Sequence, residues 1–359
     1  MVAGMRRRNR QVEGHIESSK TWNPLQAAIS SFGSRNSVTA LIVEIDMVMV
    51  FVKDTFKRSK SPLAWIVGFL LLISTSPGIG FAQDRPKLIL DADTANEIDD
   101  MYAITRMVKQ DKFEILALTS TQWIHYLAEE DSVGGSQREN EALVTLLGAT
   151  ELPTPIGSKE PMGKPWGGDE PKDSPAAQFI IKAAKAASPE SKLTVVCLGA
   201  STNLASAIKL EPSIAPNIDA YLLGFRYDHE KQVWNKSSFN VRRDLNAADY
   251  VLNCEALNLH VMPANVARPL TFVRDETFKR HQEMGELGAH LTAKWKARFA
   301  DFESWVMWDL ALVEAILHPE MATMKQLPTP PENTARTVWV YDSIQVEPMR
   351  DDYWKTVLP

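Results

Sequence analysis

The sequence predicts an α/β fold in which an open, mostly parallel sheet is flanked by helices. Short apolar runs alternate with helical patterns from Pro86 onward. Most of these runs lack the polar alternation of a strand with one solvated face, which is typical of buried parallel strands. The repeated strand-helix order supports the same class. The chain has 359 residues, 45% hydrophobic and 23% charged, which excludes a disordered or collagen-like protein.

The expected strands are short and apolar, and helical patterns separate them. The strands are predicted at residues 87–91, 113–119, 193–198, 218–224 and 259–262. The helices are predicted at residues 98–108, 136–147, 174–187, 203–210 and 246–257. Three further segments are expected to be a surface loop or lid, a charged amphipathic helical region and a late edge strand, at residues 158–173, 275–298 and 338–346 respectively.

Residues 47–82 have the pattern of a secretory signal peptide. A basic stretch precedes an apolar run at residues 63–73, and small residues lead to Ala82, as in the three regions of such a signal. The apolar run is short for a bilayer span, which needs about 20 residues, although an uncleaved membrane anchor is the alternative. We expect residues 1–46 to be disordered or wrongly assigned to the chain, residues 83–359 to form the α/β domain, and the protein to be periplasmic or secreted.

The charge of the chain argues against a nucleic-acid partner. Residues 83–359 hold 40 of the 45 Asp and Glu residues but only 29 of the 39 Lys and Arg residues, the opposite of what phosphate binding requires. The two cysteines, Cys197 and Cys254, are too few for a thiolate zinc site, and both are expected to be buried thiols. A cation site made of carboxylates, or a small neutral substrate, suits this composition better.

The most informative segment follows the first predicted strand. Five carboxylates and one amide lie within ten residues there: Asp91, Asp93, Asn96, Glu97, Asp99 and Asp100. The carboxyl ends of parallel strands are where open sheets bind ligands, and carboxylates this close repel unless a cation or hydrogen bonds offset them. Oxygen ligands favour Ca²⁺ or Mg²⁺ over zinc, and Ca²⁺ tolerates a mixed shell with open positions. A solvated acidic helix cap is the simpler alternative.

A second alternative uses the same residues. An apolar strand that ends in Asp91-x-Asp93 is also how phosphatases of the haloacid-dehalogenase type begin, with the first Asp as nucleophile. Residues 168–173 resemble their later Gly-Asp-x-x-x-Asp motif. That motif should follow an apolar strand, however, and here it lies in a Pro- and Gly-rich loop.

Four segments in order resemble the inosine-uridine preferring nucleoside hydrolase family. The first is the strand-loop-helix at residues 91–104, which is similar to its opening Asp-x-Asp…Asp-Asp motif. The others are VVCLGASTNLA at residues 195–205, SFNVRRDLNAA at residues 238–248 and MWDLALV at residues 307–313. The resemblance covers Pro86 to about Pro319 and implies a Rossmann-like fold and, commonly, a homodimer or homotetramer.

The resemblance also implies roles for individual residues. Asp93, Asp100, the backbone carbonyl of Leu198 and Asp309 would bind Ca²⁺. Asp93 would also take the proton of the attacking water. Asp99 and Asn240 would hold ribose hydroxyls. Cleavage of an N-ribosidic bond passes through an oxocarbenium-like sugar, so a held diol, nearby negative charge and an activated water are what the chemistry needs.

The sequence departs from the family pattern at several positions. Ser238 stands where a Glu often precedes Phe-Asn, and Trp308 stands where purine-handling members place a His. Because Trp cannot protonate a departing base, activation of the leaving group must come from elsewhere or a better leaving group is needed. Trp308 is expected to contact the substrate, as are Asn203 and Gln122, the latter in place of a family Gly-Asn.

The predicted function is therefore calcium-dependent hydrolysis of ribonucleosides to ribose and free base. The partner is a small-molecule nucleoside, with no nucleic acid and with a membrane only through an uncleaved signal segment. A non-catalytic nucleoside- or ribose-binding protein of the same fold is one alternative, and the phosphatase is the other.

Overall fold

The computed structural model describes residues 85–359. The predictions for residues 1–46 and for the signal peptide at residues 47–82 therefore lie outside the described residues. Within the described range, none of the helices has the length and apolar character needed to cross a membrane.

A seven-stranded sheet forms the framework, with the strand order β10-β11-β7-β4-β3-β1-β2. All neighbouring strands pair in parallel except β10 and β11, which are antiparallel. The strands are β1 (Lys87–Ala92), β2 (Glu114–Ser120), β3 (Leu193–Cys197), β4 (Ile218–Leu223), β7 (Asn258–Met262), β10 (Ala322–Pro328) and β11 (Thr337–Ile344). The predicted α/β class with a mostly parallel sheet is confirmed.

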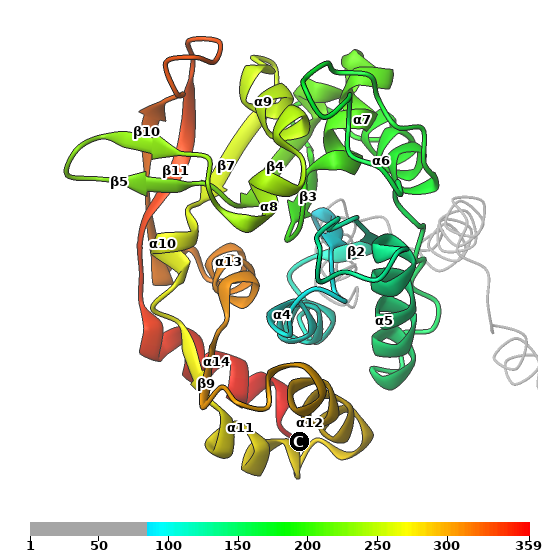
Figure 1. The fold of residues 1–359 in the computed structure, drawn as a ribbon, viewed down its shortest axis with the longest axis vertical. Helices are drawn as coiled ribbons and strands as arrows, with labels where there is room; N and C mark the ends of the chain where they lie inside the picture. The colour runs from blue at the N-terminus through cyan, green and yellow to red at the C-terminus, as the bar shows by residue number, and fades with distance from the viewer. Residues whose placement is uncertain (1–84) are drawn as a thin grey trace, which may run out of the picture. The chain divides into compact units, whose positions relative to one another are not determined.

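Helices cover both faces of this sheet, as Figure 1 shows. Successive residues of β1 point to opposite faces, so Leu88 and Leu90 belong to one buried cluster and Ile89 to the other, as strand geometry requires. The first cluster includes residues of α4 (Asp99–Val108), α5 (Ser132–Leu146), α13 (Trp308–Leu317) and α14 (Val346–Val357). The second includes residues of α6 (Pro175–Lys185), α7 (Thr202–Leu210) and α9 (Leu245–Asn253).

The C-terminal third differs in part from the sequence prediction. The late strand β11 is not at the edge of the sheet, because β10 pairs with its outer side. The sequence of β10 gives little sign of a strand, since most of its side chains are exposed and no apolar alternation marks it. The amphipathic region at residues 275–298 is two helices, α11 (Arg274–His281) and α12 (Gly285–Phe299), which meet near Gly285 at φ +59°.

Shorter elements complete the chain. Two antiparallel pairs lie outside the main sheet, β5 (Arg226–Asp228) with β6 (Val233–Asn235), and β8 (Thr271–Val273) with β9 (Ser304–Val306). Short helical segments occur at α8 (Phe239–Arg243), α10 (Ala264–Ala267), η1 (Pro212–Asn217) and η2 (Pro319–Met321). Among residues 85–359, Cys197 is a buried free thiol as expected, whereas Cys254 is only half-buried and free.

The strand order creates a switch point beside β1. The chain moves from β1 to β2 on one side, and β3 then pairs with the other side of β1. At such a point the loops after the two strands diverge and leave a crevice at their carboxyl ends. The residues after β1, β3 and β4 therefore share one rim of the sheet.

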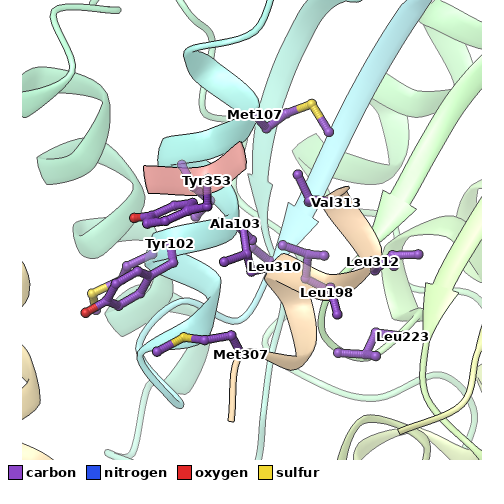
Figure 2. Close-up of a cluster of buried hydrophobic side chains, with 14 of the residues drawn as sticks. Tyr102, Ala103, Met107, Leu198, Leu223, Met307, Leu310, Leu312, Val313 and Tyr353 are labelled. Atoms are coloured by element: carbon purple, nitrogen blue, oxygen red, sulfur yellow. The ribbon is translucent and has the colours of Figure 1, made fainter. Parts of the chain in front are cut away.

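The helices α4 and α13 pack side by side under that rim (Figure 1). Figure 2 shows Leu310, Leu312 and Val313 of α13 among Tyr102, Ala103 and Met107 of α4, and the side chains of Leu198 and Leu223 from the sheet. All of them are nearly or fully buried. This packing fixes the first turns of both helices, and the acidic residues Asp99, Asp100 and Asp309 lie in those turns.

Leu312→Ala tests this core. Removing a fully buried Leu side chain, 0% exposed, should lower the free energy of unfolding by about 2–5 kcal/mol. Urea denaturation followed by circular dichroism measures it. The control is Leu127→Ala, at a side chain 65% exposed, which should change stability by less than about 0.5 kcal/mol. Equal effects of the two substitutions would contradict the packing described.

Candidate active site

The end of β1 is tied to both neighbouring strands. Asp91 O accepts the N–H of Leu198 at 2.8 Å, and Ala92 O accepts the N–H of Thr121 at 2.9 Å. The next residue, Asp93, begins a turn in which its carbonyl accepts the N–H of Asn96 at 2.7 Å. This anchoring sets Asp93, which is 2% exposed, at the carboxyl end of the sheet.

Asp99 and Asp100 occupy the first turn of α4 and are buried. Asp309 occupies the first turn of α13 and is 3% exposed. The two helix starts meet, because Asp99 Oδ2 accepts the backbone N–H of Asp309 at 3.2 Å. The positive ends of both helix dipoles therefore face the same group of carboxylates and stabilise their charge.

One oxygen from each of Asp99, Asp100 and Asp309 lies within 4.8 Å of the others. Asp93 belongs to the same electrostatic group, because it raises the pKa of both Asp100 and Asp309. Burial is the largest cause of every shift: it raises the pKa of Asp93 to about 7 and of Asp99 to about 6, and moves those of Asp100 and Asp309 well above their usual range. Without a cation, this site is costly to ionise.

The site has the features that a hard divalent ion requires. Among the described residues, Asp93 Oδ2, Asp99 Oδ1, Asp100 Oδ1 and Asp309 Oδ1 are buried and have no hydrogen-bond partner. Buried polar atoms are rarely left in this state, and carboxylate oxygens are the ligands of Ca²⁺ or Mg²⁺. Asp93 is not part of the close group of three formed by Asp99, Asp100 and Asp309. Gly199 contributes space, since a Cβ at that position would lie 2.8 Å from Asp93 Oδ1.

A second group of possible metal ligands, on α13 and α14, already has a positive charge beside it. Glu314, His318 and Asp352 also lie close enough to share an ion. The guanidinium of Arg106 already lies among them, 3.0 Å from Glu314 and 2.6 Å from Asp352. This group therefore has its own cation, and it joins α4 to α13 and α14.

A pocket opens above the first acidic group. Among the residues that line it are Asp93, Asp99, Asp100, Asp309, Asn240 and Trp308. The Asn240 side chain is held in the wall because its Nδ2 donates to Leu198 O and to Leu223 O. The Leu198 carbonyl, predicted as a metal ligand, thus accepts an amide N–H, and Leu198 is buried and is not among the residues that line the pocket. Trp308 Nε1 donates to Ala264 O at 3.2 Å, so its ring forms part of the wall.

Two residues expected to contact substrate lie elsewhere. Asn203 is 1% exposed and does not line the pocket; its Nδ2 donates to Asp91 Oδ1 at 2.9 Å and to Ser120 O at 3.0 Å. Gln122 is also fully buried, and its Nε2 donates to Thr202 and to Arg243 O. Both amides use their polar atoms to hold the rim together, a role that only the tertiary structure reveals.

The phosphatase alternative does not fit this geometry. Asp91, its expected nucleophile, is 0% exposed and accepts hydrogen bonds from Thr119 at 2.6 Å and from Asn203. Asp169, the expected magnesium ligand of the loop, forms a surface ion pair with Lys209 at 2.5 Å and does not line the pocket. None of the residues in the loop at 158–173, predicted as a surface loop or lid, lines the pocket.

The pocket wall also contains residues that the sequence patterns gave no role. Phe239 and Arg242 lie inside the motif at residues 238–248, and Leu223, Gly224, Arg226, Ser237 and Ala264 lie outside all four motifs. Arg226 and Gly224 follow β4, so the rule that ligands bind at the carboxyl ends of parallel strands could have found them.

Comparisons with known proteins establish the family of the chain. The model of the family described as inosine-uridine preferring nucleoside hydrolase matches residues 88–345, well over half of the chain. The chain belongs to this family. It is an N-ribohydrolase, an enzyme that hydrolyses the N-glycosidic bond of nucleosides, and all four motifs lie within the matched range.

Individual relatives are distant. A probable uridine nucleosidase 2 of Arabidopsis thaliana is 27% identical over 230 residues, 58% of this chain and 68% of the relative. A probable uridine nucleosidase 1 of Oryza sativa subsp. japonica is 25% identical over 274 residues, 67% of this chain and 80% of the relative.

Solved structures share the fold. An inosine-guanosine nucleoside hydrolase superposes with a TM-score of 0.60 at 17% identity, covering 76% of this chain and 98% of that one. A purine-preferring ribonucleoside hydrolase from Gardnerella vaginalis gives 0.58 at 20% identity, with 76% and 98% covered.

The acidic group of this nucleoside hydrolase should make stability depend on pH and on calcium. In the metal-free protein the raised pKa values keep a proton on Asp99 from its usual value, 3.8, to about 6 and on Asp93 from 3.8 to about 7, where the unfolded chain has lost them. Folding then takes up protons, so the free energy of unfolding falls as pH rises through this window. Calcium at a hundred times its Kd should raise Tm by about 5–10 °C at pH 8 and by less at pH 5.

Differential scanning fluorimetry in EDTA and in CaCl2 measures both effects. Asp309→Asn should raise Tm in EDTA at pH 8, because it removes one of the repelling charges, and should abolish the calcium response. Asp301→Asn, at an exposed residue, is the control and should behave as the unchanged chain does. A calcium response that survives Asp309→Asn would contradict the site.

Proposed function

We propose that the protein is a calcium-dependent hydrolase that converts ribonucleosides to ribose and free base. The observation that carries the proposal is the convergence of buried carboxylates from Asp99, Asp100 and Asp309, each of which keeps one oxygen without a hydrogen-bond partner, among the residues that line the pocket with Asp93. Within residues 85–359, no Lys or Arg forms an ion pair with these carboxylates, and buried carboxylates in this state suit a bound divalent ion better than a solvated helix cap.

The proposed ligands are Asp93, Asp100, Asp309 and the carbonyl of Leu198. Asp99 uses Oδ2 for the N–H of Asp309 and keeps Oδ1 for the ion or for a ribose hydroxyl. A bound Ca²⁺ would supply positive charge that holds a sugar diol and lowers the pKa of the attacking water. Mg²⁺ has the same ligand chemistry but demands stricter octahedral geometry.

Individual residues of the chain then have separate roles in the reaction. Asp93 takes a proton from the water that adds to C1 of the sugar, and the electron pair of the C1–N bond leaves with the base. The negative charge of Asp93 and Asp99 favours the oxocarbenium-like transition state over the neutral substrate. Asn240 is positioned by two backbone carbonyls to hold a ribose hydroxyl.

The departing base receives no proton from residue 308, because the only N–H of the Trp308 side chain is directed to Ala264 O. Its ring gives the base an apolar contact instead. Bases that leave as stabilised anions are the expected substrates. The names of the Arabidopsis and rice relatives make uridine the first compound to assay.

The assay incubates the full chain with uridine, inosine or a nitrophenyl riboside, in CaCl2 or in EDTA, and separates the products by reverse-phase chromatography. Base release should require calcium, and Asp93→Asn should lower kcat by about 10²–10⁴. Asp169→Asn, at a surface loop residue, is the control and should leave kcat unchanged. Equal release in EDTA would overturn calcium dependence. Calcium-dependent nucleoside binding without any release would instead indicate the non-catalytic alternative.

We also propose that the enzyme is exported, with residues 47–82 as the signal peptide, and that it assembles as a homodimer or homotetramer. Sequencing the N-terminus of protein from the periplasm or medium should give a start near Gln83. Light scattering on the purified protein should give two or four times the chain mass. An N-terminus upstream of residue 47, or a monomer, would contradict the respective proposal.

A further inference from the structure

Two arginines line the outer wall of the pocket without a partner. Arg226 lies at the start of β5 and Arg242 lies in α8. Both side chains are exposed. Within residues 85–359, neither guanidinium forms an ion pair or a hydrogen bond. A free guanidinium on a pocket wall is a ready group for a carboxylate or phosphate, which its planar fork binds in two places.

The backbone before Arg226 is held in an unusual conformation. Phe225 has φ +59°, the left-handed region that a residue with a bulky side chain seldom adopts. It is kept there because its ring is 0% exposed and packs edge-on against Trp234, and because its carbonyl accepts the N–H of Ala264 at 3.0 Å. Such strain is found where a site needs a particular direction of the chain, and here it precedes a pocket residue.

The turn that contains Arg242 is fixed from both sides. Arg243 donates from Nη1 to Ile124 O at 2.6 Å and stacks over the Phe239 ring at 4.6 Å. Asp244 accepts the hydroxyl of Thr202 at 2.7 Å. The neighbours of Arg242 are thus used to hold the backbone, and Arg242 is the one that remains free at the pocket.

A third group of the wall also lacks a partner. Ser238 is 2% exposed, lines the pocket, and its Oγ has no hydrogen-bond partner among the described residues. It does not cap the helical turn that follows it. A buried hydroxyl in this state calls for a ligand atom. The outer wall therefore combines two free cationic groups with one free buried hydroxyl.

The arginines are not counter-ions of the acidic group, since no carboxylate of the pocket pairs with either of them. The lining carboxylates Asp93, Asp99, Asp100 and Asp309 are buried whereas Arg226 and Arg242 are exposed, which gives the pocket a negative inner end and a positive outer wall. A ribose that presents its 2,3-diol to the inner end directs the opposite edge of its ring outward. That edge carries the base on C1 and the hydroxymethyl group on C4.

We propose that the outer wall recognises an anionic group, so that the preferred substrates are ribonucleosides that carry a phosphate on the 5-oxygen or a carboxylate on the base. This inference rests on the proposed ribonucleoside hydrolysis and names its substrate class. Arg226 and Arg242 bind the anion, and Ser238 donates its hydroxyl to it. The reaction is unchanged: water adds to C1, the C1–N bond breaks, and no bond to the anionic group is made or lost.

The test compares uridine, uridine 5′-monophosphate and orotidine, which is uridine with a carboxylate on the base, as substrates of the full chain in CaCl2. At least one anionic compound should have a kcat/KM about tenfold or more above that of uridine. The double variant Arg226→Gln, Arg242→Gln should reduce this ratio to near one. Arg268→Gln removes an exposed arginine outside the pocket and should leave both the ratio and the turnover of uridine unchanged.

The outcomes separate the possibilities. A gain with the monophosphate alone assigns the wall to phosphate, and a gain with orotidine alone assigns it to a base carboxylate. Uridine turned over as well as both anions, or a ratio that the double variant does not alter, overturns this inference and leaves the hydrolase intact. If none of the three compounds is cleaved, the proposed hydrolysis fails. In that case the dissociation constants of the three compounds are compared by calorimetry. The anion-binding inference stands if uridine 5′-monophosphate or orotidine binds the unchanged chain at least tenfold more tightly than uridine does, and if the double variant loses this difference. It fails otherwise.

Discussion

Repulsion among buried carboxylates is the constraint on which the rest of the site depends. Asp99 and Asp100 begin α4, Asp93 lies just before them after β1, and Asp309 begins the distant α13, so two separate parts of the chain bring negative charge to one place. Burial alone makes this arrangement unfavourable. Two helix starts and one backbone N–H reduce its cost, and a divalent cation would remove most of what remains. The apolar packing of α4 against α13 keeps the carboxylates together in its absence.

The same constraint explains why neighbouring polar residues are structural. Asp91, two residues before Asp93, is stabilised in a different way, because its carboxylate accepts hydrogen bonds from Thr119 and Asn203. Arg106 supplies the positive charge that balances Glu314 and Asp352, through two ion pairs that link α4 to α13 and α14. Within residues 85–359, the acidic group at the carboxyl end of the sheet has neither an ion pair nor enough hydrogen bonds to satisfy its oxygens, and this group opens into the pocket. The candidate active site is therefore the place where buried carboxylates have no counter-ion or hydrogen-bond partner within the described residues.

Local patterns predicted most of this. The five central strands from β1 to β7 and the helices α4, α5, α6, α7 and α9 follow from apolar runs and helical periodicity, whereas β5, β6 and α8 were not predicted. The acidic residues just after β1 are visible because they are adjacent in sequence. What the sequence could not show depends on tertiary contacts. The polar strand β10 exists because β11 offers it an edge. Asn203 is occupied by Asp91 instead of by substrate. Arg226 reaches the pocket because a buried Phe225 adopts a left-handed turn, which no residue pattern indicates.

A crystal structure of the protein grown with millimolar CaCl2 and ribose would test the central claim most directly. The account predicts one ion at the inner end of the pocket, about 2.3–2.6 Å from oxygens of Asp100 and Asp309, with the sugar diol on the same ion. Density that shows Asp309 directed away from the other carboxylates, or no ion at this position at a calcium concentration that supports activity, would contradict it.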